Sequence, residues 1–499
     1  MNFPLISEYI EAIKSAEDNF EQLKDLRPVL GDDGLPVMTS GNFAVVFKMK
    51  DEQSGKFYAL KCFTKDQEGR AEAYREIVKE LKDVSSPYLV SIQYFEKELF
   101  VDTDQTTETE YPVLLMDWVE GKTLDKYLRE NLADNYTLEM LVYRFSQLAQ
   151  WLIPQPFAHG DLKPDNILVR EDGTLVLVDY DGMYVPTMKG QKARELGSPD
   201  FRHPLRTEND FDEHIDDFPL VSMNLSLKAI VVNPSLLNSS NAEHLLFSEN
   251  DYLSIDTCLV LKNLFPSTDK DLNRLYGLFL LLLSNKSLYL DLNLFMEESP
   301  KINRRDDVES VETWVDEYGA IYSKDKTKLI VGADINEYTI LEGTKIICDG
   351  AFEGFRKLSK INIPSSISSI GAAAFYDCIN LLSAKIPSGV SYLDGYTFSG
   401  CVSLKKVELP NSLEDLYLNA FSNCISLYSI NLPGNLKSIG NAAFADCVNL
   451  TEVFFNSFNT YVEKDAFANC PQKLVIYVPQ GQLDFYKEMI RRFNIKLYE

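Results

Sequence analysis

Apolar residues recur at the spacing of an amphipathic helix near the start of the chain. They are Leu5, Ile6, Tyr9, Ile10, Ile13, Phe20, Leu23 and Leu26. Steps of three and four residues place such side chains on one face of a helix. The spacing therefore predicts an N-terminal helical extension over residues 1–30, whose apolar face packs on the domain that follows.

Residues 31–297 alternate between strand-like and helix-like patterns. Strand-like runs lie at 45–47, 57–63 and 113–116, and helix-like stretches lie at 71–84 and 138–152. Strands come early and helices come late, which predicts an α+β domain with two lobes. The polar stretch 298–324 interrupts the periodicity and is predicted to be a linker.

The last third of the chain repeats every 23 residues. The repeated positions include Phe352, Phe375, Phe398, Phe421, Phe444 and Phe467, as well as Cys378, Cys401, Cys424, Cys447 and Cys470. A unit of this length cannot bury an apolar face alone, so the copies must stack. We therefore predict a β-rich solenoid over residues 325–499, with buried structural cysteines rather than a disulfide framework or a zinc site.

Acidic residues outnumber basic ones by 75 to 49, which gives a net charge of −26. A field of this sign opposes nucleic acid and anionic membranes, so we expect neither as a partner. Residues 1–20 lack the apolar core of a secretory signal, and the longest apolar run, 275–283, is too short to span a bilayer. We expect a cytoplasmic protein.

Two short stretches carry the candidate chemistry. Residues 159–169 read His-Gly-Asp-Leu-Lys-Pro-Asp-Asn-Ile-Leu-Val, and residues 178–182 read Val-Asp-Tyr-Asp-Gly. Phosphoryl transfer needs a carboxylate to orient the attacking hydroxyl and hard oxygen ligands for a magnesium ion. The first stretch resembles the catalytic loop of protein kinases, and the second resembles their metal-binding turn.

This resemblance implies an ATP-dependent protein serine/threonine kinase that uses Mg²⁺, with Mn²⁺ as a possible substitute. Asp161 would be the catalytic base and Lys163 would contact the transferred phosphate. Asn166 and Asp179 would hold the metal. A lysine two residues after the base is typical of the serine/threonine type, so the substrate would be a protein hydroxyl.

Upstream residues resemble the nucleotide-binding strands of the same family. Residues 39–46 resemble the glycine-rich loop, and Ala59-Leu60-Lys61 resembles the strand that carries the phosphate-binding lysine. The resemblance implies nucleotide contacts from Ser40, Gly41, Asn42, Phe43, Val46, Ala59 and Lys61. It also implies an ion pair between Lys61 and a helix glutamate, for which Glu76 has the best spacing and Glu72 and Glu80 are alternatives.

The hinge and the large lobe can be placed in the same way. Residues 114–121 resemble the adenine-binding hinge, with Met116 as the gatekeeper and the backbone of Asp117, Trp118 and Val119 facing the base. Further on, residues 197–204 resemble the stretch in which a hydroxyl, here Ser198, bridges the catalytic base and lysine. Asp217 is the expected aspartate that braces the catalytic loop.

Three departures from the family pattern affect the function. Thr39 and Ala44 replace glycines of the nucleotide loop, which weakens the match there. Gly160 replaces the arginine that binds an activation-loop phosphate, so we expect activity that does not depend on that modification. Asp181 replaces the glycine of the metal-binding turn and adds a carboxylate whose effect the sequence does not explain.

The repeated unit resembles BspA-like leucine-rich repeats, and residues 477–493 resemble that family's terminal cap. The combination is similar to bacterial kinase-like proteins, and the repeats imply recruitment of a substrate or another protein partner. Two other functions are compatible with the motifs. A pseudokinase scaffold would bind nucleotide without transfer, and a small-molecule phosphotransferase would also use a His-Gly-Asp sequence.

Overall fold

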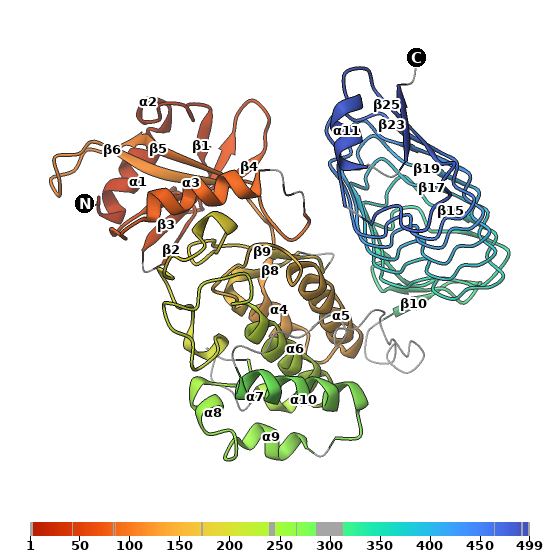
Figure 1. Cartoon of the computed structure of the whole chain (residues 1–499), viewed down its shortest axis with the longest axis horizontal. Coiled ribbons are helices and arrows are strands. Elements are labelled where there is room, and N and C mark those ends of the chain that lie inside the picture. The colour runs from red at the N-terminus through yellow and green to blue at the C-terminus, as the bar shows by residue number, and fades with distance from the viewer. Residues whose placement is uncertain are drawn as a thin grey trace. The chain divides into compact units, whose positions relative to one another are not determined.

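The computed structural model describes residues 3–41, 43–82, 84, 86–170, 173–238, 245–265, 267–285, 313–463, 465–490 and 493–497. The chain forms two compact units (Figure 1). One consists of residues 1–132 and 144–298, and the other consists mainly of residues 299–499. The first is an α+β domain with two lobes and the second is a β-solenoid, as the sequence predicts.

A six-stranded antiparallel sheet forms the N-terminal lobe. Its strands in spatial order are β1 (Leu26–Pro28), β3 (Ala44–Asp51), β4 (Phe57–Phe63), β6 (Glu110–Asp117) and β5 (Ile92–Phe100), with β2 (Met38–Ser40) paired to β3. Helix α3 (Arg70–Leu81) packs against β5. The buried side chains of α3 recur at steps of three and four residues, which explains why the sequence predicts this helix.

The N-terminal extension completes the core of this lobe. It contains α1 (Ile6–Lys14) and α2 (Ala16–Asn19). Tyr9 and Ile13 are fully buried in one apolar cluster with side chains of β3 and β4, and the Tyr9 hydroxyl donates a 2.7 Å hydrogen bond to the Phe63 carbonyl. The helical segment is shorter than the predicted 1–30, because from Leu26 the chain joins the sheet as β1.

Truncation of the buried helix face should destabilise this lobe. We expect Ile13→Ala to lower the free energy of unfolding by about 2–5 kcal/mol, because it leaves a cavity in the lobe's core. Leu5→Ala is the matched control, since Leu5 is 53% exposed, and it should change stability by less than about 0.5 kcal/mol. Urea unfolding followed by hydrogen exchange in peptides from β3 and β4 measures both, and equal effects would contradict this packing.

Helices dominate the C-terminal lobe. They are α4 (Leu124–Glu130), α5 (Asn135–Leu152), α6 (Asp217–Val232), α7 (Ser235–Asn238), α8 (Glu249–Leu253), α9 (Leu259–Leu264) and α10 (Lys270–Ser284). A small sheet of β7 (Lys122–Thr123), β8 (Ile167–Val169) and β9 (Leu175–Leu177) lies in the same lobe. The lobe also contains three 3₁₀ turns: η1 (Pro164–Asn166) before β8, and η2 (Pro186–Met188) and η3 (Pro199–Phe201) after β9. Residues 217–231 of α6 are all buried, so this helix lies in the core of the lobe.

The second unit coils into a solenoid whose strands pair in parallel from one repeat to the next. Its strands are β10 (Thr313–Val315), β11 (Ile321–Ser323), β12 (Lys328–Val331), β13 (Glu337–Thr339), β14 (Ile346–Ile347), β15 (Lys360–Asn362), β16 (Ser369–Ile370), β17 (Ser383–Lys385), β18 (Tyr392–Leu393), β19 (Lys406–Glu408), β20 (Asp415–Leu416), β21 (Ser429–Leu432), β22 (Ser438–Ile439), β23 (Glu452–Phe455), β24 (Tyr461–Val462), β25 (Val475–Val478) and β26 (Asn494–Leu497). Partner residues such as Leu416 and Ile439 are 23 positions apart, so the sequence period is the strand register.

The repeated phenylalanines and cysteines form two internal ladders. Rings of successive phenylalanines from Phe352 to Phe467 stack with centroids 4.9–5.4 Å apart. Each repeat cysteine is buried, and its thiol donates a hydrogen bond to the carbonyl of the phenylalanine 26 residues earlier, as Cys401 does to Phe375 at 3.1 Å. The thiols are therefore structural hydrogen-bond donors, in keeping with the prediction.

Both ends of the solenoid differ in detail from the sequence expectation. Residues 298–312 of the expected linker lie outside the described residues, and from Thr313 the chain already pairs as β10 and β11, which close the first coil. At the other end the predicted cap helix is α11 (Leu483–Met489), and β26 then adds a further parallel strand. Short strands of this kind lack a repeat signal, so the pattern misses them.

Removal of one ring from the phenylalanine ladder should weaken the solenoid. Phe398 is fully buried between Phe375 and Phe421, so we expect Phe398→Ala to lower the free energy of unfolding by about 3–5 kcal/mol. Phe458→Ala removes the same atoms from a side chain that is 60% exposed and should be nearly silent. Hydrogen exchange of solenoid peptides in urea reports both, and a silent Phe398→Ala would refute the ladder's role.

Candidate active site

The register of the N-terminal sheet places four predicted nucleotide contacts on one face. Val46 pairs with Lys61 across β3 and β4, and Ala59 pairs with Met116 across β4 and β6. Ala59 and Lys61 are two residues apart on one strand, so their side chains point to the same side. Val46, Ala59 and Met116 are apolar, so Lys61 carries the only charge in this set of four.

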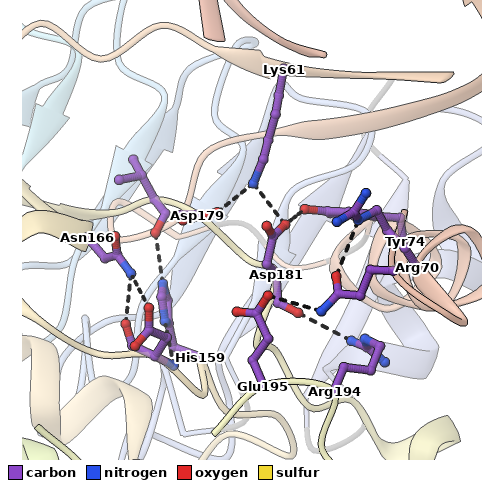
Figure 2. A network of polar contacts seen from close by, with 12 residues as sticks. Lys61, Arg70, Tyr74, His159, Asn166, Asp179, Asp181, Arg194 and Glu195 are labelled. Atoms are coloured by element: carbon purple, nitrogen blue, oxygen red, sulfur yellow. Dashed lines mark hydrogen bonds and ion pairs between the residues drawn. The ribbon is translucent and has the colours of Figure 1, made fainter. Parts of the chain in front are cut away.

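Lys61 is buried and contacts two carboxylates that follow β9. Its Nζ atom lies 2.7 Å from Asp179 Oδ1 and 2.8 Å from Asp181 Oδ1 (Figure 2). Burial by itself would lower the pKa of Lys61, but the two carboxylates outweigh burial and raise it. The lysine therefore keeps its positive charge in this site.

A second cluster lies on the loop between α5 and β8. Lys163 Nζ lies 2.8 Å from Asp161 Oδ2, and Asn166 Nδ2 donates to the carbonyl and the carboxylate of Asp161 at 2.9 and 3.1 Å. Burial would raise the pKa of Asp161, but the hydrogen bond and charge of Lys163 reverse this, and the pKa is lowered. Asp161 is therefore an ionised acceptor, which suits a group that orients a hydroxyl.

Asp216, the residue that precedes α6, braces this loop. Its buried carboxylate accepts hydrogen bonds from the backbone N–H groups of His159 and Gly160, the latter at 3.0 Å. The expectation that Asp217 has this role was wrong by one position, because Asp217 instead contacts His214 at 3.2 Å. The sequence alone does not show at which of these two adjacent aspartates α6 begins, so it does not distinguish their roles.

Gly160 and Gly182 allow the catalytic loop to touch the segment after β9. Gly160 has φ +81°, and a Cβ atom there would lie 1.9 Å from the Gly182 carbonyl oxygen. Beside this contact Ala158 and Tyr184 exchange backbone hydrogen bonds of 3.1 and 2.9 Å. The close backbone approach explains why a glycine stands where an arginine is usual.

Comparison with known families agrees with this geometry. Residues 35–245 match the protein kinase domain family, and residues 333–486 match the BspA type leucine rich repeat region in six copies. The chain joins a protein kinase domain to BspA-type leucine-rich repeats. In the part of the chain that the structure describes, no helix is both long and apolar enough to cross a membrane.

The curated relatives of the kinase domain are serine/threonine-protein kinases. Identity is 27% over 163 residues to one from Drosophila melanogaster, 29% over 165 residues to AtPK1/AtPK6 of Arabidopsis thaliana, and 32% over 153 residues to Sgk3 of Rattus norvegicus. These matches cover 32%, 30% and 30% of this chain but only 19%, 32% and 29% of those proteins. The similarity therefore concerns the kinase domain alone.

Solved structures similar to this chain include a vaccine antigen and a leucine-rich repeat protein. The pneumococcal vaccine antigen PcpA is 24% identical, with a TM-score of 0.34. The match covers 38% of this chain and 48% of the PcpA chain. A leucine-rich repeat protein from Eubacterium ventriosum is 26% identical, with a TM-score of 0.28. The match covers 32% of this chain and 50% of the chain of that protein.

The kinase hinge has fewer free backbone donors than the sequence suggests. The N–H of Asp117 donates to the Ser91 carbonyl at 3.3 Å, and the N–H of Trp118 donates to Phe57 at 3.1 Å. The side chain of Asp117 forms an ion pair with Lys56 at 2.7 Å. The backbone N–H groups of Asp117 and Trp118 are therefore already used within the protein.

The predicted nucleotide loop, residues 39–46, spans the end of β2 and the start of β3. Ser40 and Gly41 are exposed at the end of β2, and the Phe43 side chain is 39% exposed beside the Lys65 ammonium group, 5.5 Å from its ring centre. Asn42, another expected contact, lies outside the described residues. The described part of the loop is thus accessible from solvent, as a phosphate-covering hairpin requires.

The predicted ion pair between Lys61 and Glu76 is not formed. Within the described residues, Glu76 lies on α3 and lines a cavity of about 500 Å³ together with Glu72 and Thr187, whereas Lys61 contacts Asp179 and Asp181. Tyr74 is the α3 residue that reaches the site, where its hydroxyl donates to Asp181. The expectation failed because spacing along the sequence does not fix the rotation of a helix about its axis.

Ser198 reaches the catalytic residues through its backbone. Its N–H donates a 2.8 Å hydrogen bond to Asp161 Oδ1, whereas the sequence suggested a bridge made by its hydroxyl. The hydrogen bond fixes the second carboxylate oxygen of Asp161, while Lys163 and Asn166 contact the first. The segment before η3 thus holds the Asp161 carboxylate in position through a backbone hydrogen bond, which a side-chain motif does not reveal.

The donor set suits magnesium held together with a nucleotide. Asp179 has φ +68°, a strained conformation for a residue other than glycine, and its side chain is 44% exposed. No group of three His, Cys, Asp or Glu side chains converges on a metal position among the described residues. Magnesium is usually bound by one or two protein oxygens plus phosphate oxygens and water, so Asp179 and Asn166 fit it.

Proposed function

We propose that the kinase domain transfers the γ-phosphate of ATP to serine or threonine hydroxyls of a protein substrate. One observation carries the proposal: a buried lysine of the N-terminal lobe and three oxygen-bearing side chains of the C-terminal lobe face one site. These are Lys61, Asp161, Asn166 and Asp179. A phosphoryl transfer site requires this combination of cation, base and metal ligands.

The chain's own residues provide binding and orientation. Val46, Ala59 and Met116 would pack against the adenine, while Ser40, Gly41 and Phe43 would cover the phosphates from the β2–β3 hairpin. Lys61 would contact the α- and β-phosphates. A magnesium ion, held by Asp179 and Asn166, would neutralise negative charge on the phosphates.

Asp161 would act on the substrate side of the site. Its ionised carboxylate accepts the hydrogen bond of the attacking hydroxyl and orients one oxygen lone pair toward the phosphorus. Lys163, 2.8 Å from Asp161, would place a positive charge beside the transferred group. Ser198 keeps the carboxylate in this orientation through its backbone N–H.

The leucine-rich-repeat domain would bring the substrate or another protein partner to the kinase domain. Support comes from its architecture, because a stack of coils offers an extended surface on which exposed positions repeat. Exposed apolar side chains, among them Leu382, Tyr428 and Val448, lie on this unit. Such side chains are compatible with a protein ligand.

Incubation of the full chain with radiolabelled ATP, Mg²⁺ or Mn²⁺ and a general protein substrate tests the activity. We expect label on serine or threonine of the protein. Label on a sugar or an amino alcohol alone would instead show a small-molecule phosphotransferase. Nucleotide binding without transfer under every metal condition would show a pseudokinase scaffold.

A further inference from the structure

The two carboxylates that contact Lys61 differ in their access to solvent. The side chain of Asp179 is 44% exposed, whereas that of Asp181 is only 11% exposed. An exposed carboxylate can bind a metal ion that arrives with a nucleotide. A buried one remains with the lysine, so Asp181 is the more permanent partner of the two.

Several contacts fix the position of Asp181. The Tyr74 hydroxyl donates to the same carboxylate oxygen that Lys61 contacts (Figure 2). Tyr74 is 2% exposed and its ring stacks on Tyr94 with centroids 5.7 Å apart, so the hydroxyl is held rigidly. On the other side Arg194 Nη2 lies 3.5 Å from the Asp181 carbonyl oxygen.

Helix α3 is connected to this part of the structure by hydrogen bonds that do not involve Glu76. Gln67, just before the helix, donates a 3.0 Å hydrogen bond to Glu195, and Arg70 donates to Gln67 at 3.3 Å. The carboxylate of Glu76 borders the separate cavity described above. The helix thus contributes a tyrosine hydroxyl to the site, and the carboxylate comes from the metal-binding turn itself.

We propose that Asp181 is the positioning residue of Lys61, in the place that a glutamate of α3 was expected to fill. This inference rests on the proposed phosphoryl transfer and adds the residue that holds its lysine. When Asp179 turns to a metal ion, Lys61 remains anchored by Asp181. The site then needs no carboxylate from α3, which contributes the Tyr74 hydroxyl instead.

A double-mutant cycle on the ligand-free full chain tests the ion pair without any activity. Lys61→Met and Asp181→Asn, alone and combined, are compared by urea unfolding. We expect the combined effect on the unfolding equilibrium constant to differ from the product of the single effects by about tenfold. Glu76→Gln is the matched control, the same change of carboxylate to amide, and should combine with Lys61→Met within about twofold.

Steady-state phosphoryl transfer provides the second measurement. We expect Asp181→Asn to lower kcat/KM for ATP about tenfold to a hundredfold, since a charged hydrogen bond to Lys61 is lost, and Glu76→Gln to stay within about twofold. Independence of Asp181 and Lys61 in the cycle, or a loss in Glu76→Gln equal to that in Asp181→Asn, would overturn the proposal. A wild-type chain that transfers no phosphate would refute the kinase function alone, because the cycle still decides the ion pair.

Discussion

Replacement of Asp161 by asparagine should reduce phosphate transfer by about a hundredfold to ten-thousandfold. The amide keeps the shape of the side chain but does not act as a base, and in one of its two orientations its Nδ2 group would face the ammonium group of Lys163, which now lies 2.8 Å from a carboxylate oxygen. In the other orientation Nδ2 would replace the oxygen that accepts the hydrogen bond of the Ser198 N–H. Initial rates with radiolabelled ATP measure the effect.

The control is Asp165→Asn, the same chemical change four residues further on. Asp165 is exposed on η1, so the variant should transfer phosphate within about twofold of the wild-type rate. Affinity for ADP should be similar in both variants, because neither side chain is among the expected nucleotide contacts. An Asp161→Asn protein with more than a tenth of the wild-type rate would exclude Asp161 as the base.

Gly160→Ala should destabilise the kinase domain by about 2–5 kcal/mol. A left-handed backbone costs an alanine about 1–2 kcal/mol, and overpacking adds about 1–3 kcal/mol. The added methyl group would lie 1.9 Å from the Gly182 carbonyl, a backbone atom that cannot rotate away. Urea unfolding of the full chain, followed by hydrogen exchange in peptides from residues 173–232, measures the loss.

Gly190→Ala separates the two contributions. Gly190 has φ +85°, but no heavy atom lies within 4 Å of a Cβ atom built there. This variant should therefore show only the backbone cost of about 1–2 kcal/mol. If Gly160→Ala were no more destabilising than Gly190→Ala, the contact between the catalytic loop and Gly182 would not be tight.

Local and periodic features were the ones that the sequence predicted well. The 23-residue step is also the strand register, because stacked coils must place equivalent side chains above one another. The catalytic loop was found because Asp161, Lys163 and Asn166 lie within six consecutive residues and contact one another. Features of this kind need no knowledge of how distant segments meet.

Long-range relations were harder to predict. The lysine partner was assigned to Glu76, but the rotation of α3 directs Tyr74 to the site. Asp181 was noted only as a departure, since its ion pair with Lys61 spans 120 positions along the chain. Strand β1 within the expected helix and the choice between Asp216 and Asp217 depend on similar tertiary detail.

The coil-to-coil pairing of the solenoid has an evolutionary consequence. Each inner repeat bonds only to the repeats before and after it, and every junction uses one register of 23 positions. Duplication or loss of one complete unit therefore preserves all types of junction, whereas a shorter insertion in a strand would break two of them. Gene rearrangement can thus lengthen or shorten the solenoid in whole units while the kinase domain that precedes it in the sequence stays unaltered.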